Sequence, residues 1–214
     1  MALHNFWVSQ QGGLTPFAFY NCAHSRNSVS CGQRTGHTHE STSDPDALLA
    51  RKGSGKEAKL SYNGNLLIEN RNGLIVTTEV FQANGTAERD AALVMLEQIP
   101  GEHRVTVGAD KAYDTEGFVR ECRNMKVTPQ VAQNTKGSGG SATDARTIRH
   151  RGYAISQWKR KRIEEGFGWL KTIALMRKVR HRGIFKVGWV FTFAAAAYNL
   201  VRMRNLLATP VGAA

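Results

Sequence analysis

Alternating hydrophobic and polar positions predict a pair of antiparallel strands early in the chain. Residues 59–70 (KLSYNGNLLIEN) and 73–83 (GLIVTTEVFQA) are rich in β-branched and aromatic residues. Between them lies an Asn-Gly step at Asn72 and Gly73, which is typical of a tight hairpin turn. We therefore expect two neighbouring strands in one sheet.

Downstream of this hairpin the hydrophobic period alternates between that of helices and that of strands. Thr86, a small polar residue, precedes a run in which apolar residues recur at helical spacing up to Ile99, and Pro100-Gly101 ends this run. The later segments are a short buried strand at 104–109, a helix at 115–124, a strand at 126–133, a Gly/Ser-rich basic loop at 134–152 and helices at 154–179 and 185–207. This order predicts an α/β domain on a mixed sheet flanked by helices, with two long C-terminal helices.

The two ends of the chain differ from this pattern. Residues 1–32 lack clear periodicity and are rich in Asn, Ser, Gln and Gly, so we expect them to be poorly structured or an accretion. Residues 33–57 form a polar, charged connector. The predicted organisation is thus an N-terminal segment of residues 1–32, one domain of residues 33–208 and a tail of residues 209–214.

The chain is strongly basic, with a formal net charge of +12 and a pI near 10.0 in 214 residues. Thirteen Lys and Arg but only three Asp and Glu fall between residues 136 and 182. Such an excess repels itself unless an anionic polymer neutralises it, and nucleic acid is the default partner. The alternative is a basic protein without a specific partner. Trp158 and Trp169 lie in the same stretch; either could stack on an unpaired base, although core packing is favoured for Trp169.

Cysteines and hydropathy exclude some other classes. The chain has three cysteines, Cys22, Cys31 and Cys122, and no CxxC motif, which argues for a reducing compartment and against a disulfide framework. Cys22 and Cys31 with nearby histidines could form a zinc cluster, but their spacing matches no standard finger. The longest apolar stretch, residues 187–201, is shorter than the ~20 residues that span a bilayer. We therefore expect a helix buried in a core and no membrane partner.

Two carboxylates are candidates for metal chemistry. Asp110 directly follows the predicted strand 104–109, where α/β sheets place functional groups, and Glu164 lies on the predicted helix 154–179. Hard divalent cations prefer oxygen ligands, and paired ions support phosphoryl transfer. Alternatively, Asp110 could have only a turn or N-cap role, and so could Asp114. Glu164 could be a solvated helix residue that pairs with Arg160.

Helical spacing groups Glu164 with two cations. Arg160, Glu164 and Lys171 are separated by four and seven residues, which at 100° per residue puts them within about 40° of one another. A carboxylate between phosphate-binding cations suits a site that acts on DNA. A salt-bridged surface helix would show the same pattern.

The segments GADKAYD around Asp110 and RKRIEEGFGWLK around Glu164 resemble the insertion-sequence transposases of the DDE group, as do THESTSDPDALLARKGSGKEAKLSYNGN and AAAAYNLVRMRNLL. The likeness covers roughly residues 33–208. It implies a ribonuclease H-like core, a cytoplasmic protein, double-stranded DNA at element ends and target, and Mg²⁺ or Mn²⁺ held by Asp110 and Glu164. Arg160 and Lys171 would contact phosphate, in a pattern where Gln157 replaces the family's frequent Tyr. Homo-oligomerisation is left open.

The resemblance also implies that one carboxylate is missing. The family has three, the first on the first strand of the core, whereas residues 1–32 contain no Asp or Glu. We therefore expect that strand to be absent, as in a truncated or frameshifted copy. Its loss would leave a hydrophobic edge beside Leu66 and Ile68, or force residues 1–20 to cover it, with marginal stability.

Three functions follow as alternatives. The first is a DNA-cleaving and strand-transferring transposase, in which a two-metal site activates water and the freed 3′-hydroxyl attacks target DNA. The second is a catalytically inactive fragment that only binds DNA or a full-length transposase. The third, a basic RNA-binding protein, leaves the ordered motifs unexplained. In the first two, the expected backbone contacts include Lys159, Lys161, Arg162, Arg149 and Arg151.

Overall fold

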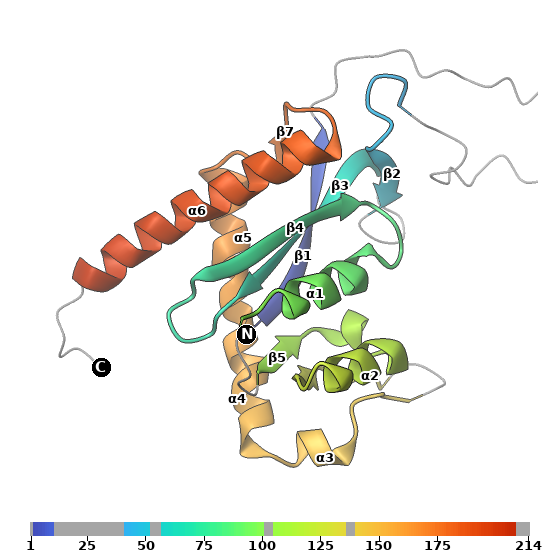
Figure 1. Cartoon of the computed structure of the whole chain (residues 1–214), viewed down its shortest axis with the longest axis vertical. Helices are drawn as coiled ribbons and strands as arrows, with labels where there is room; N and C mark the ends of the chain where they lie inside the picture. Colours follow the sequence, from blue (N-terminus) through green and yellow to red (C-terminus); the bar gives the residue numbers. More distant parts are fainter. Residues whose placement is uncertain (1, 11–40, 52–56, 101–104, 136–139, 209–214) are drawn as a thin grey trace, which may run out of the picture.

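A single mixed sheet organises the part of the chain that the structure describes. The structure, a computed structural model, describes residues 2–10, 41–51, 57–100, 105–135 and 140–208. Seven strands in these ranges join in the order β2-β3-β1-β5-β6, with β4 pairing with β3 and β7 with β1 (Figure 1). The predicted α/β class with a mixed sheet is confirmed.

The predicted hairpin is formed by β3 (Ala58–Ile68) and β4 (Ile75–Gln82). In its turn the Glu69 carboxylate accepts hydrogen bonds from the backbone N–H groups of Arg71 and Asn72. Gly73 has φ +75°, a left-handed conformation that L side chains rarely adopt. The hairpin is thus formed where the sequence predicted, but its connection runs over residues 69–74, and of the Asn-Gly pair only Gly73 has a positive φ.

The strand β1 (Ala2–Gln10) lies in the sheet between β3 and β5 (Thr106–Ala109). It runs antiparallel to β3, with Ala2 opposite Ile68 and Ser9 opposite Ser61, and parallel to β5, with Ala2 opposite Gly108. The prediction that the N-terminal segment is poorly structured is wrong for residues 2–10, because the unpaired edge of β3 templates a strand there. Residues 11–32 lie outside the described part of the chain, and so do both candidate zinc cysteines. The sequence left open whether the edge of the sheet beside Leu66 and Ile68 would be exposed or covered by residues 1–20, and the structure shows it covered by β1.

One face of the sheet carries α1 (Ala87–Glu97) and α2 (Glu116–Asn124). The side chains of Leu67, Met95, Val107 and Phe118 meet there in a buried cluster. Both helices begin where the sequence predicted, and the Thr115 hydroxyl accepts a hydrogen bond from the N–H of Phe118. The strand β6 (Thr128–Val131) follows α2 and pairs parallel to β5.

The opposite face carries α5 (Ile163–Thr172) and α6 (Ile184–Ala208). Leu66 packs on this side and Leu67 on the other, as strand alternation requires. The approach is close at Gly64, where a Cβ would lie 3.0 Å from the Phe191 ring. Glycine at this position lets α6 pack directly on the middle of β3.

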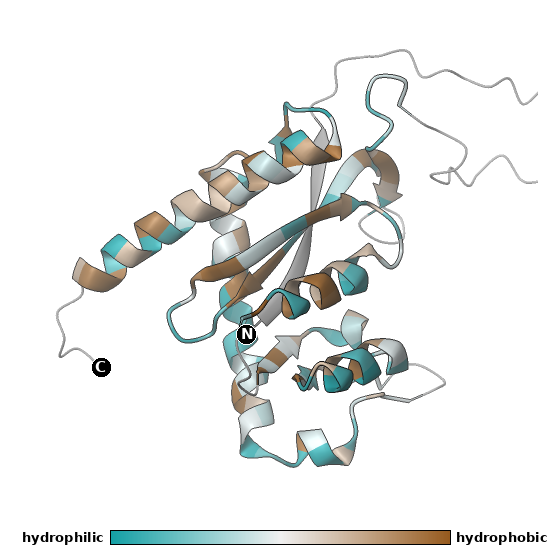
Figure 2. Cartoon of the chain, in the orientation of Figure 1, coloured by the Kyte–Doolittle hydropathy of each residue, from teal (hydrophilic) through white to brown (hydrophobic). Residues whose placement is uncertain are grey.

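The helix α6 ends within one residue of the predicted range at each end, but its environment differs from the expected buried core. One face, from Val187 through Phe191 to Tyr198, is buried against the sheet, while Trp189 and Phe193 on the other face are exposed. Figure 2 shows hydrophobic residues along this helix. By length and composition alone, α6 could also cross a membrane. The sequence predicted the helix correctly but not the exposure of one of its apolar faces.

The predicted long helix 154–179 is wrong as a single element. This range instead contains most of α4 (Arg151–Lys159), a 3₁₀ turn η2 (Arg160–Arg162), α5, and the short strand β7 (Lys178–Val179). The short helix α3 (Ala145–Ile148) lies before it, in the predicted loop. The helix stops after Thr172 because Leu175 takes a left-handed φ of +56° and the N–H of Met176 donates to the carbonyl of Leu170. Pairing of β7 with β1 and of β2 (Leu48–Arg51) with β3 creates two strands that the sequence did not announce.

Candidate metal and DNA-binding site

Asp110 lies at the carboxyl end of β5, as predicted. Its backbone is extended, and its carboxylate accepts a hydrogen bond of 2.8 Å from the N–H of Ala112, so that it caps the 3₁₀ turn η1 (Lys111–Tyr113). Val107 and Ala109 pack with α1 and α2, so alternation directs Gly108 and Asp110 towards the side on which α4 packs against β5. Both the N-cap role and a position suited to a ligand are therefore compatible with its geometry.

Glu164 lies in the first turn of α5 and is exposed to solvent. The 3₁₀ turn η2 separates it from Arg160, and a 3₁₀ turn advances roughly 120° per residue instead of 100°. Over three residues this rotates Arg160 by roughly 60° from the position that a continuous helix would give it. The predicted grouping of Arg160 with Glu164 is correspondingly loosened, whereas Glu164 and Lys171 stay on one continuous helix.

Gln157, the departure from the family pattern, joins α4 to the sheet. Its side-chain amide donates to the carbonyl of Gln130 in β6 at 2.6 Å, and its oxygen accepts from the Arg160 guanidinium at 2.9 Å. Arg160 is half-buried by this arrangement. Gln157 thus fixes where the Arg160 cation lies.

The other candidate cations differ in their surroundings. Arg162 donates to the carbonyls of Asn70 and Arg71, at 3.2 and 2.6 Å, and so ties η2 to the β3–β4 hairpin. Lys171 lies 5.8 Å from the centre of the Phe167 ring and lines a pocket of about 450 Å³ together with Arg177, Lys178 and Arg180. Of the remaining candidates, Arg149 directly after α3, Arg151 on α4 and Lys161 in η2 are exposed, and Lys159 is half-buried.

The two tryptophans of this basic region have different surroundings. Trp169 packs edge-on against Tyr198, with ring centres 5.8 Å apart, beside the core under α5 and α6. Trp158 on α4 is 69% exposed. The predicted core role of Trp169 is confirmed, and Trp158 keeps a face open for stacking.

Asp114, the last residue of GADKAYD, holds the segment that leads to α3. It is buried, and its carboxylate accepts hydrogen bonds from the N–H of Asn134 at 2.6 Å, the N–H of Thr143 at 3.0 Å and the hydroxyl of Thr143 at 3.1 Å. Burial alone would raise the pKa of Asp114, but the hydrogen bonds from Ser141, Asn134 and Thr143 outweigh it and lower that pKa below its ordinary value. The structure thereby gives Asp114 a structural role, which was one of the alternatives for it.

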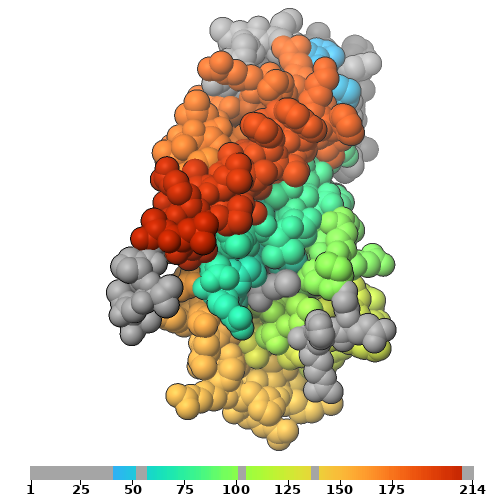
Figure 3. All heavy atoms as spheres, turned by 60° about the vertical axis from the view of Figure 1, so that its left-hand side comes forward, coloured from blue at the N-terminus to red at the C-terminus, as the bar shows by residue number. Residues whose placement is uncertain are grey.

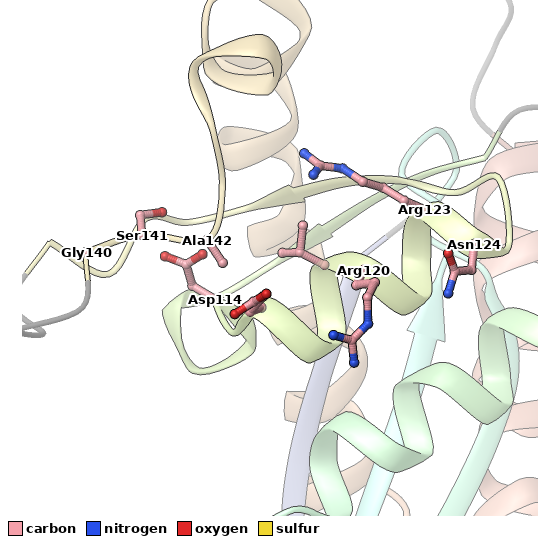
Figure 4. Close-up of a pocket in the computed structure, with 9 residues that line it drawn as sticks. Asp114, Arg120, Arg123, Asn124, Gly140, Ser141 and Ala142 are labelled. Carbon is pink, nitrogen blue, oxygen red and sulfur yellow. The ribbon is translucent and has the colours of Figure 1, made fainter.

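A pocket of about 650 Å³ opens beside Asp114, between α2 and residues 140–142 (Figure 4). Arg120 and Arg123 of α2 lie along it, and Arg123 pairs with Asp144 at 3.2 Å. Asp110 and Glu164 are not among its lining residues. Neither predicted ligand therefore lines this pocket.

Two further acidic residues anchor α6, and the sequence did not reveal their role. The N–H of Gly183 donates to Asp44 at 3.2 Å, the N–H of Ile184 donates to Asp46 at 2.9 Å, and the Tyr62 hydroxyl also donates to Asp44. Burial and the adjacent Asp44 carboxylate raise the pKa of the Tyr62 hydroxyl above its ordinary value. Carboxylates at a helix N-terminus offset its unpaired N–H groups and its dipole. The only signal for this in the sequence was a pair of aspartates in a polar connector.

The described residues do not complete a three-ligand metal site. Within the part of the chain covered by the structure, no group of three His, Cys, Asp or Glu residues is close enough to hold a metal ion. The strand β1, beside β5, contains neither Asp nor Glu, and its register brings His4 level with Asp110. Among the described residues, neither Asp110 nor Glu164 therefore belongs to a group of three such side chains.

Comparison with known protein families gives a match to a transposase family. The family described as "Transposase DDE domain" matches residues 34–200, which is most of the chain and contains Asp110, Glu164, Arg160 and Lys171. No curated protein matches the chain. The matched range begins after β1 and includes α6 up to Leu200.

Proposed function

We propose, from the premise that the chain belongs to the transposase DDE-domain family, that this polypeptide binds DNA in transposition without completing strand cleavage by itself. Membership indicates transposition, a soluble cytoplasmic protein and a family that generally depends on divalent metal ions. The finer points, which are a ribonuclease H-like core, DNA contact and the part played by each site residue, are our proposal. The observation that carries it is the absence of a third carboxylate beside Asp110 and Glu164 in the described residues.

The basic region supports DNA binding. Residues 136–182 carry a net charge of +10. Arg149, Arg151 and Lys161 are exposed, and Lys171 lies with other cations around one pocket. Clustered cations attract a polyanion and release its counterions, which gives affinity with little dependence on base sequence. Trp158 adds an exposed aromatic surface for an unpaired base.

The strand order supports a ribonuclease H-like core. An antiparallel β4-β3-β1 unit is followed by β5 and β6, which run parallel to β1, and helices cover both faces. In the family the first carboxylate lies on the first strand, next to the strand that carries the second. The corresponding place here is β1, whose sequence ALHNFWVSQ lacks a carboxylate. Asp110 and Glu164 would be the ligands of Mg²⁺ or Mn²⁺, but the residues at hand do not fit the family's three-carboxylate set, so we derive no metal-dependent step.

DNA binding is tested by fluorescence anisotropy with a labelled duplex over a range of salt concentrations. We expect log K to fall linearly with log salt, and the variant Arg149→Ala/Arg151→Ala/Lys161→Ala to reduce the slope by about 0.9 for each phosphate contact it removes. The matched control is Arg51→Ala/Lys59→Ala/Arg120→Ala, which loses the same charge from exposed positions elsewhere. Equal slopes for the two triple variants, or no binding at low salt, would refute the assigned surface.

The catalytic part is tested by incubating the protein with terminal-repeat DNA and Mg²⁺ or Mn²⁺ and resolving nicked strands. We expect wild type and Asp110→Ala to give the same background. Robust metal-dependent nicking that Asp110→Ala abolishes would overturn the inactive assignment and establish the alternative, a catalytic transposase. Because the binding assay does not require metal, the two parts of the proposal fail independently.

A further inference from the structure

The exposed face of α6 carries an unbroken apolar stripe. Its large residues are strongly exposed: Phe185 85%, Trp189 65%, Phe193 64%, Leu200 66%, Met203 40% and Leu207 87%. At 100° per residue this stripe lies roughly 170° around the helix from the buried stripe of Val187, Phe191 and Tyr198. Figure 3 shows α6, in orange and red, as a band across one face of the molecule. Core packing therefore explains one apolar side of α6 and leaves the other unexplained.

The spacing of the stripe is that of a coiled-coil seam. From Trp189 the positions advance by four, three, four, three and four residues: Trp189, Phe193, Ala196, Leu200, Met203 and Leu207. Alternating steps of four and three are the heptad pattern by which one helix packs into another. From Trp189 to Leu207 the seam advances 18 residues, which is about 27 Å of helix. A helix is thus the partner that this surface fits, and the seam contains no charged residue.

We infer that this stripe is a homodimer interface in which the α6 helices of two copies pack antiparallel. When two identical helices pack antiparallel, the two residue numbers that face each other have the same sum in every layer. Around a two-fold axis at the level of Tyr198, Trp189 meets Leu207 of the second copy, Phe193 meets Met203, and Ala196 meets Leu200. Every layer then combines an aromatic or a small side chain with an aliphatic one, which gives layers that pack without large voids.

A parallel arrangement fits less well. It would stack each residue on its own copy, so that a Trp–Trp layer would be two layers from an Ala–Ala layer, and the helices could not stay at one distance. It would also bring the two Arg204 side chains, next to Met203, to the same end of the pair. In the antiparallel pair these like charges lie at opposite ends, where they repel less.

The area available matches what a stable dimer needs. Large apolar side chains bury roughly 150–250 Å² each when they are fully covered. The five large residues of the seam, at exposed fractions of 40 to 87%, offer roughly 600 Å² per copy. Interfaces of standard size bury about 800 Å² per partner. The stripe alone is close to that area, and an isologous contact needs no second surface.

The oligomeric state of the full chain, measured by light scattering after size-exclusion chromatography, is the first test. We expect wild type to be a dimer, and Phe193→Glu/Leu200→Glu to lower the dimer affinity at least about a hundredfold, because each added carboxylate would be buried without a partner. The control Asn205→Glu adds a charge to an exposed position of α6 outside the seam and should stay dimeric. Circular dichroism of both variants should match wild type, because neither change touches the buried face.

Cross-linking tests the orientation in a background in which the three native cysteines are replaced. Phe193→Cys and Met203→Cys should each give little disulfide-linked dimer alone and a strong heterodimer when mixed. A disulfide-linked homodimer of Leu200→Cys, together with no heterodimer between Phe193→Cys and Met203→Cys, would indicate parallel packing and contradict the inference.

A monomeric wild type overturns the proposal whatever else it binds. Vesicles of phosphatidylcholine identify one such outcome: a monomer that co-sediments with them, and loses this with Phe193→Glu/Leu200→Glu, would show that the stripe faces a lipid surface. A monomer that does not co-sediment with vesicles would show that the stripe binds neither a second copy of the chain nor a lipid surface.

Discussion

The same substitution should destabilise the protein strongly at Asp114 and hardly at all at Asp110, the two aspartates of GADKAYD. Asp114→Asn keeps the shape of the side chain but retains only one acceptor oxygen, and it turns an amide NH₂ towards the N–H groups of Asn134 and Thr143. Hydrogen bonds to a carboxylate contribute about 1.5–3 kcal/mol each, and a buried donor that loses its acceptor costs about 1–3 kcal/mol. We expect a loss of about 3 kcal/mol in the free energy of unfolding.

Asp110→Asn is the matched control. Its one cap hydrogen bond, from the N–H of Ala112, can be kept by the amide oxygen, and Asn and Asp are nearly equivalent N-caps. The expected change is within about 0.5 kcal/mol. Urea unfolding followed by tryptophan fluorescence measures both variants. With a slope of roughly 3 kcal/mol per M, Asp114→Asn should move the midpoint down by about 1 M.

The stability difference between wild type and Asp114→Asn should also depend on pH in a defined direction. Because the pKa of Asp114 is lowered in the folded protein, its ionisation stabilises the fold above the unfolded value of 3.8. That contribution is lost as the pH falls through the folded pKa, so the gap between wild type and Asp114→Asn should narrow at acid pH. Equal midpoints for Asp114→Asn and Asp110→Asn at neutral pH, or a gap that widens on acidification, would refute the structural role of Asp114.

Two other predictions concern buried groups. Asp44→Ala removes the acceptor shared by the Tyr62 hydroxyl and the Gly183 N–H, so we expect about 2 kcal/mol of destabilisation and a melting temperature lower by about 6 °C in differential scanning calorimetry; an unchanged melt would show that α6 does not need this anchor. Burial raises the pKa of the Cys122 thiol to about 12, so peptide mass spectrometry should find Cys122 unalkylated by iodoacetamide in the folded protein and alkylated in urea; rapid labelling at pH 8 without denaturant would contradict its burial.

Most helices and strands could be predicted from the sequence, because their ends depend on interactions between residues that are neighbours along the chain. The Asn72-Gly73 turn, the helix after Thr86 and the helix after Thr115 follow from capping and turn preferences that act within a few residues. The break of the long basic helix at η2 did not follow, because Arg160 to Arg162 have ordinary helix propensity. There a contact remote in sequence, from Arg162 to the hairpin carbonyls, accompanies the change of geometry.

The sequence by itself determined the family and the α/β order, because these depend on residue type and on spacing along the chain, and it nominated Asp110 and Glu164 as ligands, which stays a prediction. Only the tertiary structure decided that residues 2–10 form a strand of the sheet, that Asp114, Asp44 and Asp46 are anchors, and that α6 is apolar on both sides with one side uncovered. A strand is stabilised by the edge it pairs with, a buried carboxylate by donors far along the chain, and an apolar helix face by whatever lies against it. None of these partners can be identified from the residue's own neighbours in sequence, because hydrogen bonding and burial act through space.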